Sequence, residues 1–160
     1  MQTFTKAGIL ALAFAALVSV ASAAPVVTQC GAPIKSIVKT DIEFFNTTSE
    51  APVTIPSASV TISVPAGATR CVRVRFSAIA NCPNACFLRA FENVNQLNPA
   101  WVSNALRFSS DQTNNGMAHS FEWAGRVGAG LHTIRIKIET GNICCVASIG
   151  PMTTSVDIME

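Results

Sequence analysis

Residues 59–82, SVTISVPAGATRCVRVRFSAIANC, carry the pattern that decides the fold. Polar and apolar side chains alternate through residues 59–64, a Pro65-Ala66-Gly67 turn follows, and the alternation resumes at residues 71–76. Alternation places successive side chains on opposite faces of a strand, which is typical of a half-buried antiparallel sheet. The second strand should therefore present one face formed by Val72, Val74 and Phe76 and another formed by Cys71, Arg73 and Arg75.

The same alternation recurs along the chain, at residues 121–123, 134–138 and 156–158. Less regular strands are expected at residues 41–45, 87–91, 105–108 and 143–149. Beyond the first 23 residues, no window of about 12 residues keeps the apolar stripe of an amphipathic helix. About 8–10 short strands in one unit predict an all-β fold, a single antiparallel β-sandwich of jelly-roll or immunoglobulin-like type.

The first 23 residues have the pattern of an export signal. A basic start at residues 1–6 precedes an apolar run at residues 7–20, and Ala21-Ser22-Ala23 supplies a small-residue cleavage motif. The run of about 14 residues is shorter than the roughly 20 that span a bilayer. We therefore expect a signal peptide at residues 1–23, a domain at residues 24–160, secretion or periplasmic location, and no membrane insertion after signal removal.

The six cysteines are expected to form structural disulfides, because an exported chain reaches an oxidising compartment. Cys82 and Cys86 flank a short turn and should bond to each other. Cys144 and Cys145 should point to opposite faces of one strand, so bonds to different partners, such as Cys30 and Cys71, would fit, and the pairing of these four cysteines stays open. A strained vicinal disulfide is the alternative for the adjacent pair. No C-x₂-C motif occurs, so no metal site is expected.

The charged residues argue against nucleic acid as a partner and raise the question of an anion-binding patch. The formal net charge of the full chain is only +2, which gives no footprint for nucleic acid. If their two strands were neighbours, four cations would form a patch suited to sulfate, phosphate or uronate groups: Arg73, Arg75, Arg135 and Lys137. The alternative, which we favour, is an ordinary solvated surface on which Glu139 and Asp157 lie near these cations.

Aromatic and histidine side chains give weak functional signals. Long loops are expected at residues 93–105 and 109–116, and Trp101 in the first could stack on a sugar ring, although the chain has no tyrosine to support such a site. His119 and His132 are expected at the surface or at strand edges. No G-x-S-x-G or H-E-x-x-H motif accompanies them, so no catalytic residue and no cofactor are predicted.

The stretch at 59–82 followed by Cys86-Phe87-Leu88-Arg89 resembles a group of small exported bacterial β-sandwich proteins. In that group a VPAG turn precedes a strand with an RFSA-like end and a close cysteine pair. The run HSFEWAGRVGAGLHTIRIKIE at 119–139 is similar as well, with its turn into an HTI strand. The resemblance covers roughly residues 55–160 and implies fold and export, but the group has no activity to transfer.

These observations predict a non-catalytic exported module that binds an extracellular or periplasmic ligand or partner protein through its loops. One alternative is a structural protein that joins a surface fibre or coat through exposed edge strands. A third is a secreted hydrolase whose motifs are not recognisable.

Overall fold

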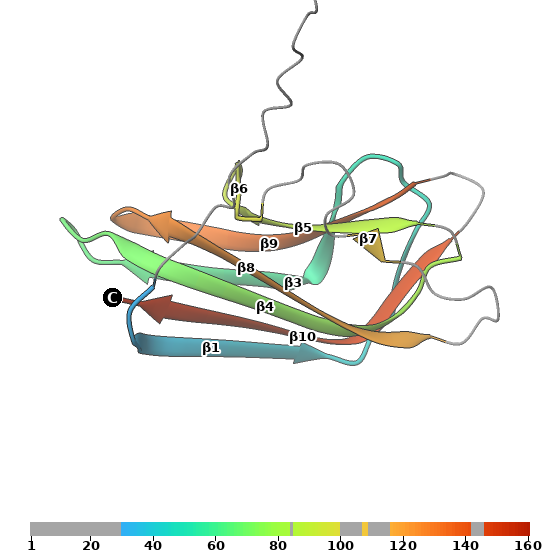
Figure 1. Ribbon diagram of the computed structural model, residues 1–160, viewed down its shortest axis with the longest axis horizontal. Helices are drawn as coiled ribbons and strands as arrows, with labels where there is room; N and C mark the ends of the chain where they lie inside the picture. Colours follow the sequence, from blue (N-terminus) through green and yellow to red (C-terminus); the bar gives the residue numbers. More distant parts are fainter. Residues whose placement is uncertain (1–29, 84, 100–106, 109–115, 142–145) are drawn as a thin grey trace, which may run out of the picture.

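The computed structural model describes residues 30–83, 85–99, 107–108, 116–141 and 146–160. These residues form two antiparallel sheets packed face to face, which confirms the predicted all-β sandwich (Figure 1). The expected signal peptide at residues 1–23, the candidate ligand residue Trp101, and both Cys144 and Cys145 lie outside the described residues.

Sheet A has the strand order β1-β10-β4-β8, and β2 also pairs with β10. Its strands are β1 (Pro33–Asp41), β2 (Phe45–Thr47), β4 (Arg70–Asn81), β8 (Met117–Val127) and β10 (Ala147–Met159). Sheet B has the order β3-β9-β5-β6, and β7 also pairs with β5. Its strands are β3 (Val53–Val64), β5 (Cys86–Glu92), β6 (Asn95–Gln96), β7 (Arg107–Phe108) and β9 (Gly130–Thr140). Strands β3 and β4 therefore belong to different sheets, and the turn between them joins the two sheets.

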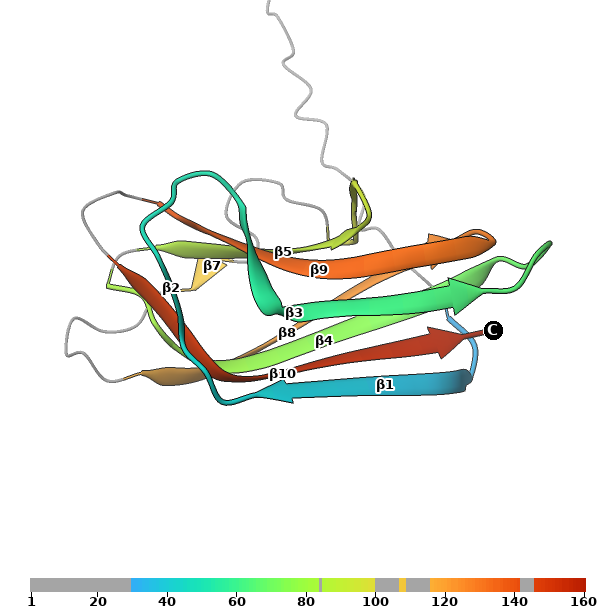
Figure 2. The ribbon, with the colours of Figure 1, turned by 180° about the vertical axis from the view of Figure 1, so that it is seen from behind.

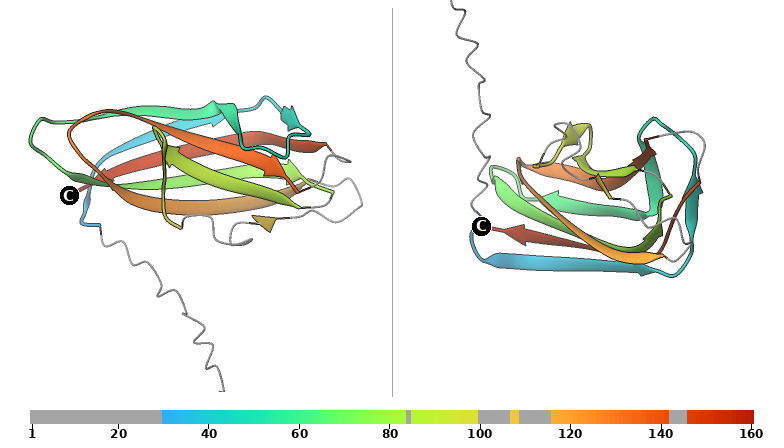
Figure 3. Two further views of the ribbon diagram at one scale, coloured as in Figure 1. Left: turned by 90° about the horizontal axis from the view of Figure 1, so that it is seen from above. Right: turned by 45° about the vertical axis from the view of Figure 1, so that its right-hand side comes forward.

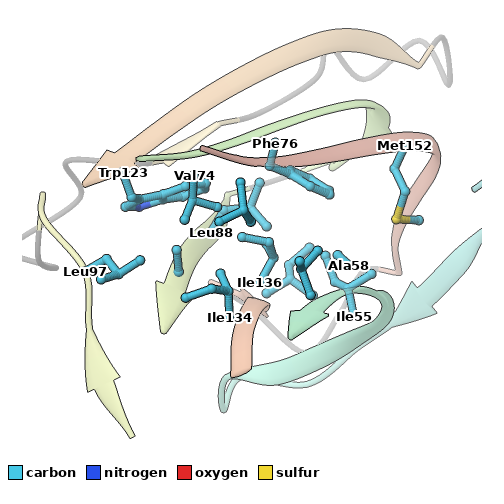
Figure 4. Packing of buried hydrophobic residues seen from close by; sticks show 14 of the residues in the cluster. Ile55, Ala58, Val74, Phe76, Leu88, Leu97, Trp123, Ile134, Ile136 and Met152 are labelled. Carbon is cyan, nitrogen blue, oxygen red and sulfur yellow. The ribbon is translucent and has the colours of Figure 1, made fainter. Parts of the chain in front are cut away.

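The core fills the space between the sheets with the inward side chains of the long strands (Figure 4). The predicted inward residues are buried: Val60, Ile62, Val64, Val72, Val74, Phe76, Trp123, Ile134, Ile136, Ile138, Val156 and Ile158. Burying each large apolar side chain contributes roughly 1.5–3 kcal/mol, so this alternation supplies the main driving force for the sandwich. The predicted strands around these residues are confirmed, although each strand is longer than the stretch in which polar and apolar residues alternate regularly.

The expected strand at residues 41–45 is wrong, because the chain leaves the sheet there. β1 ends at Asp41 and β2 begins at Phe45, and both lie along the same edge of β10 (Figure 2). Between them the register of β10 shifts at Gly150 and Pro151. A Cβ atom on Gly150 would lie within 2.4 Å of the Glu43 carbonyl oxygen, and the φ of Gly150 is +146°. The passing loop and the backbone conformation therefore both require glycine at this break in the edge.

Strand β1 was not predicted at all. Its nine residues, PIKSIVKTD, are exposed except for Ile37 and Asp41, which are half-buried. A strand at a sheet edge with both faces largely in water has no reason to alternate apolar and polar residues. The sequence signal on which the other strands were recognised is therefore missing from this one.

The opposite edge of sheet A is connected to sheet B. The backbones of Asn98 and Ala124 exchange two hydrogen bonds, which join the chain after β6 to β8. Leu97 is buried beside Gly125, where an added Cβ would come within 2.6 Å of the leucine side chain. The predicted loop at residues 93–105 thus contains the short strand β6 and a segment that ties the two sheets together.

The disulfides are Cys30–Cys71 and Cys82–Cys86. The close pair agrees with the prediction, whereas Cys30 and Cys71 bond to each other and not to Cys144 or Cys145, which were considered as their partners. Residues Gly31 and Ala32 exchange backbone hydrogen bonds with Glu160 at the end of β10, which carries Cys30 to the outer face of β4. The disulfide therefore spans the C-terminal end of β10, with the chain terminus beside the start of β1 (Figure 1).

Candidate functional site

Arg73 and Arg75 surround a buried carboxylate on the outer face of sheet A. Arg73 Nη2 lies 3.1 Å and Arg75 Nη2 lies 2.6 Å from Asp157 Oδ2, and Ser36 Oγ donates to Oδ1 at 2.6 Å. The Asp157 side chain is only 4% exposed. These contacts join β1, β10 and β4, so the two arginines are held by an internal partner.

The hydrogen bond from Ser36 and those from Arg73 and Arg75 lower the pKa of Asp157 below its ordinary value of 3.8. Burial acts in the opposite direction, but the donors outweigh it. The carboxylate is therefore charged whenever the protein is near neutral pH, and it stabilises the fold in that form.

Arg135 and Lys137 lie on β9 in sheet B, whereas Arg73 and Arg75 lie on β4 in sheet A, so the patch of four cations that depended on neighbouring strands does not form. The outer faces of the two sheets point in opposite directions (Figure 3). Arg135 Nη1 donates to the Asn93 backbone carbonyl at 3.2 Å, and Lys137 Nζ lies 4.5 Å from the centre of the Phe91 ring. The alternative of an ordinary surface with Asp157 and Glu139 nearby describes these residues better, and Arg89 forms an ion pair with Glu139.

His132 was expected at the surface or at a strand edge, but its side chain is largely buried at one end of the sandwich. Its Nδ1 lies 2.6 Å from Glu92 Oε1, and its Nε2 lies 2.8 Å from the Gly128 carbonyl oxygen. The His132 and Glu92 side chains are 12% and 10% exposed. Asn93 and Asn95 donate to the same carboxylate at 2.6 and 3.2 Å. The cluster ties the turn after β5 to the start of β9 and to the β8–β9 turn.

The cluster contains a histidine next to a carboxylate, as many catalytic sites do, but its histidine has no ring nitrogen free to reach a substrate. A histidine that acts as a general base needs one ring nitrogen free to reach the substrate. Both nitrogens of His132 have protein partners, and the Glu92 oxygens accept bonds from three side chains. The geometry therefore favours a structural role for the cluster.

His119 belongs to a row of rings on the inward face of β8. Its ring stacks on Phe121 with centroids 6.2 Å apart, and Phe121 stacks on Trp123 at 6.0 Å. Partial burial lowers the pKa of His119 from 6.5, because the charged ring loses hydration. Trp123 is buried as predicted. The row extends the core toward the end of the sheet.

A shallow hollow of about 390 Å³ is lined by four uncharged polar residues and one apolar residue: Asn46, Thr47, Thr48, Ser49 and Val146. None of these five side chains is ionisable, so the lining itself supplies no acid or base. Within the described part of the chain, no three His, Cys, Asp or Glu side chains are placed to hold a metal ion. Of the expected binding loops at 93–105 and 109–116, residues 100–105 and 109–115 lie outside the described residues.

The clearest exposed feature is the edge chain from β1 into the 42–44 loop. It carries four of the nine large apolar side chains that the described residues expose: Ile34, Val38, Ile42 and Phe44. Among the described strands, none pairs with the side of β1 that faces away from β10. Sequence reasoning missed this site because β1 lacks alternation, although Ile34, Ile37 and Val38 in an otherwise polar run were a usable signal.

Comparison with family models and with curated proteins gives no significant match for this chain. In the part of the chain that the structure describes, no helix has the length and apolar character needed to cross a membrane. The two disulfides are typical of an oxidising, extracellular-type compartment.

Replacing Asp157 with asparagine should lower the free energy of unfolding at pH 7 by about 2 kcal/mol, because charge-assisted hydrogen bonds are lost. Since the pKa of Asp157 is lowered in the folded state, its stabilisation is present above pH 3.8 and is lost as the pH falls further. Urea denaturation of wild type and D157N between about pH 7 and pH 2 should therefore show the two converging in acid. Equal stability at neutral pH would contradict this role, and S77A serves as the control on the same face.

Replacing Glu92 with alanine should lower the free energy of unfolding by about 3 kcal/mol, because His132, Asn93 and Asn95 lose a common buried acceptor. The exposed Glu43 provides the matched control, and E43A should change stability by less than about 0.5 kcal/mol. Urea denaturation of E92A, H132A and the double variant measures the coupling. Additive effects of E92A and H132A would contradict a direct link between these side chains.

Proposed function

We propose that this protein is an exported, non-catalytic module that binds a partner protein through the outer edge of β1 and the adjoining 42–44 loop. The observation that carries the proposal is a nine-residue edge strand that exposes apolar side chains and whose outer edge pairs with none of the described strands. Unpaired backbone groups on such an edge are ready to add a strand from another chain.

The site differs from the loops that the sequence analysis expected to bind. Main-chain hydrogen bonds along an edge supply affinity for an extended segment, and side chains such as Val38 supply selectivity. Val38 is 62% exposed and shares the outer face of β1 with Ser36, which is tied to Asp157. The rigid sheet thus presents this side chain in a fixed position.

A surface fibre is the alternative closest to this proposal. An open fibre needs two different surfaces that complement each other, so that each subunit binds one neighbour on either side. The far edge of sheet A is occupied at Ala124 by the Asn98 bridge, which argues for a closed interaction through β1. For a hydrolase, the engaged nitrogens of His132 and the uncharged hollow offer no support.

The proposal is tested by placing the photocrosslinker p-benzoylphenylalanine at position 38 in the exporting cell. Position 94 is the matched control, since Val94 is also an exposed valine but lies in the β5–β6 turn. We expect ultraviolet-dependent protein adducts at position 38 and few at position 94. Adducts that are absent from position 38, or equal at the two positions, would contradict binding through the β1 edge.

A further inference from the structure

The two faces of β1 are assigned by its contacts. Ser36 donates to Asp157 on the outer face of sheet A, so Val38 and Thr40 share that face. Lys39 Nζ donates to the Ser59 carbonyl oxygen of β3 at 3.4 Å, so Lys35, Ile37 and Asp41 share the face toward sheet B. Figure 3 shows β1 and β3 on the same side of the sandwich.

The charges on the face toward sheet B are arranged so that this strand complements itself. In an antiparallel pair, residues directly opposite each other lie on the same face of the sheet, and opposite charges there stabilise the pair. If a two-fold axis passes at Val38, Lys35 of each copy lies opposite Asp41 of the other. The outer face then pairs Ser36 with Thr40 and Val38 with Val38. On the face toward sheet B, Ile37 lies opposite Lys39, whose aliphatic stem can pack on the isoleucine.

Other two-fold registers bring like charges together or lose pairing. An axis at Ile37 places Lys35 opposite Lys39 twice, and an axis at Lys39 places the two Lys39 side chains face to face, which is unfavourable. An axis at Ser36 places Lys35 opposite Ile37 and Lys39 opposite Pro33, so it pairs no opposite charges, and Pro33 has no N–H to donate. Lys35 and Lys39 therefore disfavour pairing of the β1 edge in other registers, and the register with the axis at Val38 is the favoured one.

We propose that the partner of the β1 edge is a second copy of this chain, bound by antiparallel β1–β1 pairing about a two-fold axis at Val38. The inference rests on the proposed function, because it names the partner of the same edge. Such a contact is isologous, so it closes at a dimer and merges the two A sheets into one continuous sheet. The interface is small, so a weak dimer is expected.

The first test is sedimentation equilibrium of the exported protein with its disulfides intact, at concentrations up to about 1 mM, where a small interface is occupied. Val38→Lys places two lysines face to face on the axis and should raise the dissociation constant about tenfold or more. Val94→Lys makes the same exposed change in the β5–β6 turn and should leave the constant within about twofold. Unchanged thermal melting of both variants shows that the fold is retained.

The second test addresses the register. Lys35→Asp places like charges at both symmetry-related pairs and should weaken the dimer about tenfold, and the exchange variant K35D/D41K should recover most of the loss. Arg70→Asp changes the net charge equally on β4, away from the β1 edge, and should have little effect. A dimer that is weakened by K35D but not recovered by K35D/D41K would overturn the Val38 register.

The outcomes separate this inference from the proposed function. A wild-type protein that stays monomeric overturns the dimer, and crosslinks from position 38 to a different protein would then leave binding through the β1 edge intact. A dimer that V38K does not weaken overturns the β1–β1 contact. Crosslinks from position 38 with twice the mass of the chain, together with a V38K-sensitive dimer, support both.

Discussion

The pairing of the C-terminal strand β10 between β1 and β4 is the constraint on which the rest of sheet A depends. β10 contacts β1 and β2 along one edge and β4 along the other, so the first and fourth strands meet only through the last one. Asp157 near its end bonds to Ser36 on β1 and to Arg73 and Arg75 on β4. The Cys30–Cys71 disulfide fixes the N-terminal segment across the end of the same strand. Because β10 takes one edge of β1, the other edge is the one left for a partner.

Much of the fold could be predicted from the sequence, because the core strands are half-buried. Val72, Val74 and Phe76, like the isoleucines of β9, alternate with polar residues, and that pattern carries both the strand and the face it buries. β1 could not be recognised in this way, because both of its faces contact water. The break at residues 42–44 depends on the register shift of β10 at Gly150, which lies more than a hundred residues later in the chain.

The candidate site was predicted less well, because it depends on which strands are neighbours. Alternation assigned Arg73 and Arg135 to strand faces correctly. It contained no information on sheet membership, so it could not exclude a cation patch whose members turn out to lie in two different sheets. The Cys82–Cys86 bond follows from local spacing, whereas Cys30–Cys71 depends on where the first and last strands meet. His132 and Glu92 are brought together by the pairing of β5 with β9, and no local motif marks that contact.

The central claim is that β1 is hydrogen-bonded on one side only in the isolated chain and acquires a partner on the other. Amide hydrogen exchange of residues 35–41, followed by NMR in dilute and concentrated samples, tests it most directly. In a dilute sample, alternate amides should be protected by β10 while those between them exchange rapidly, and concentration should protect the second set. Uniform protection of all these amides in the dilute sample, or rapid exchange of the second set at every concentration, would contradict the account.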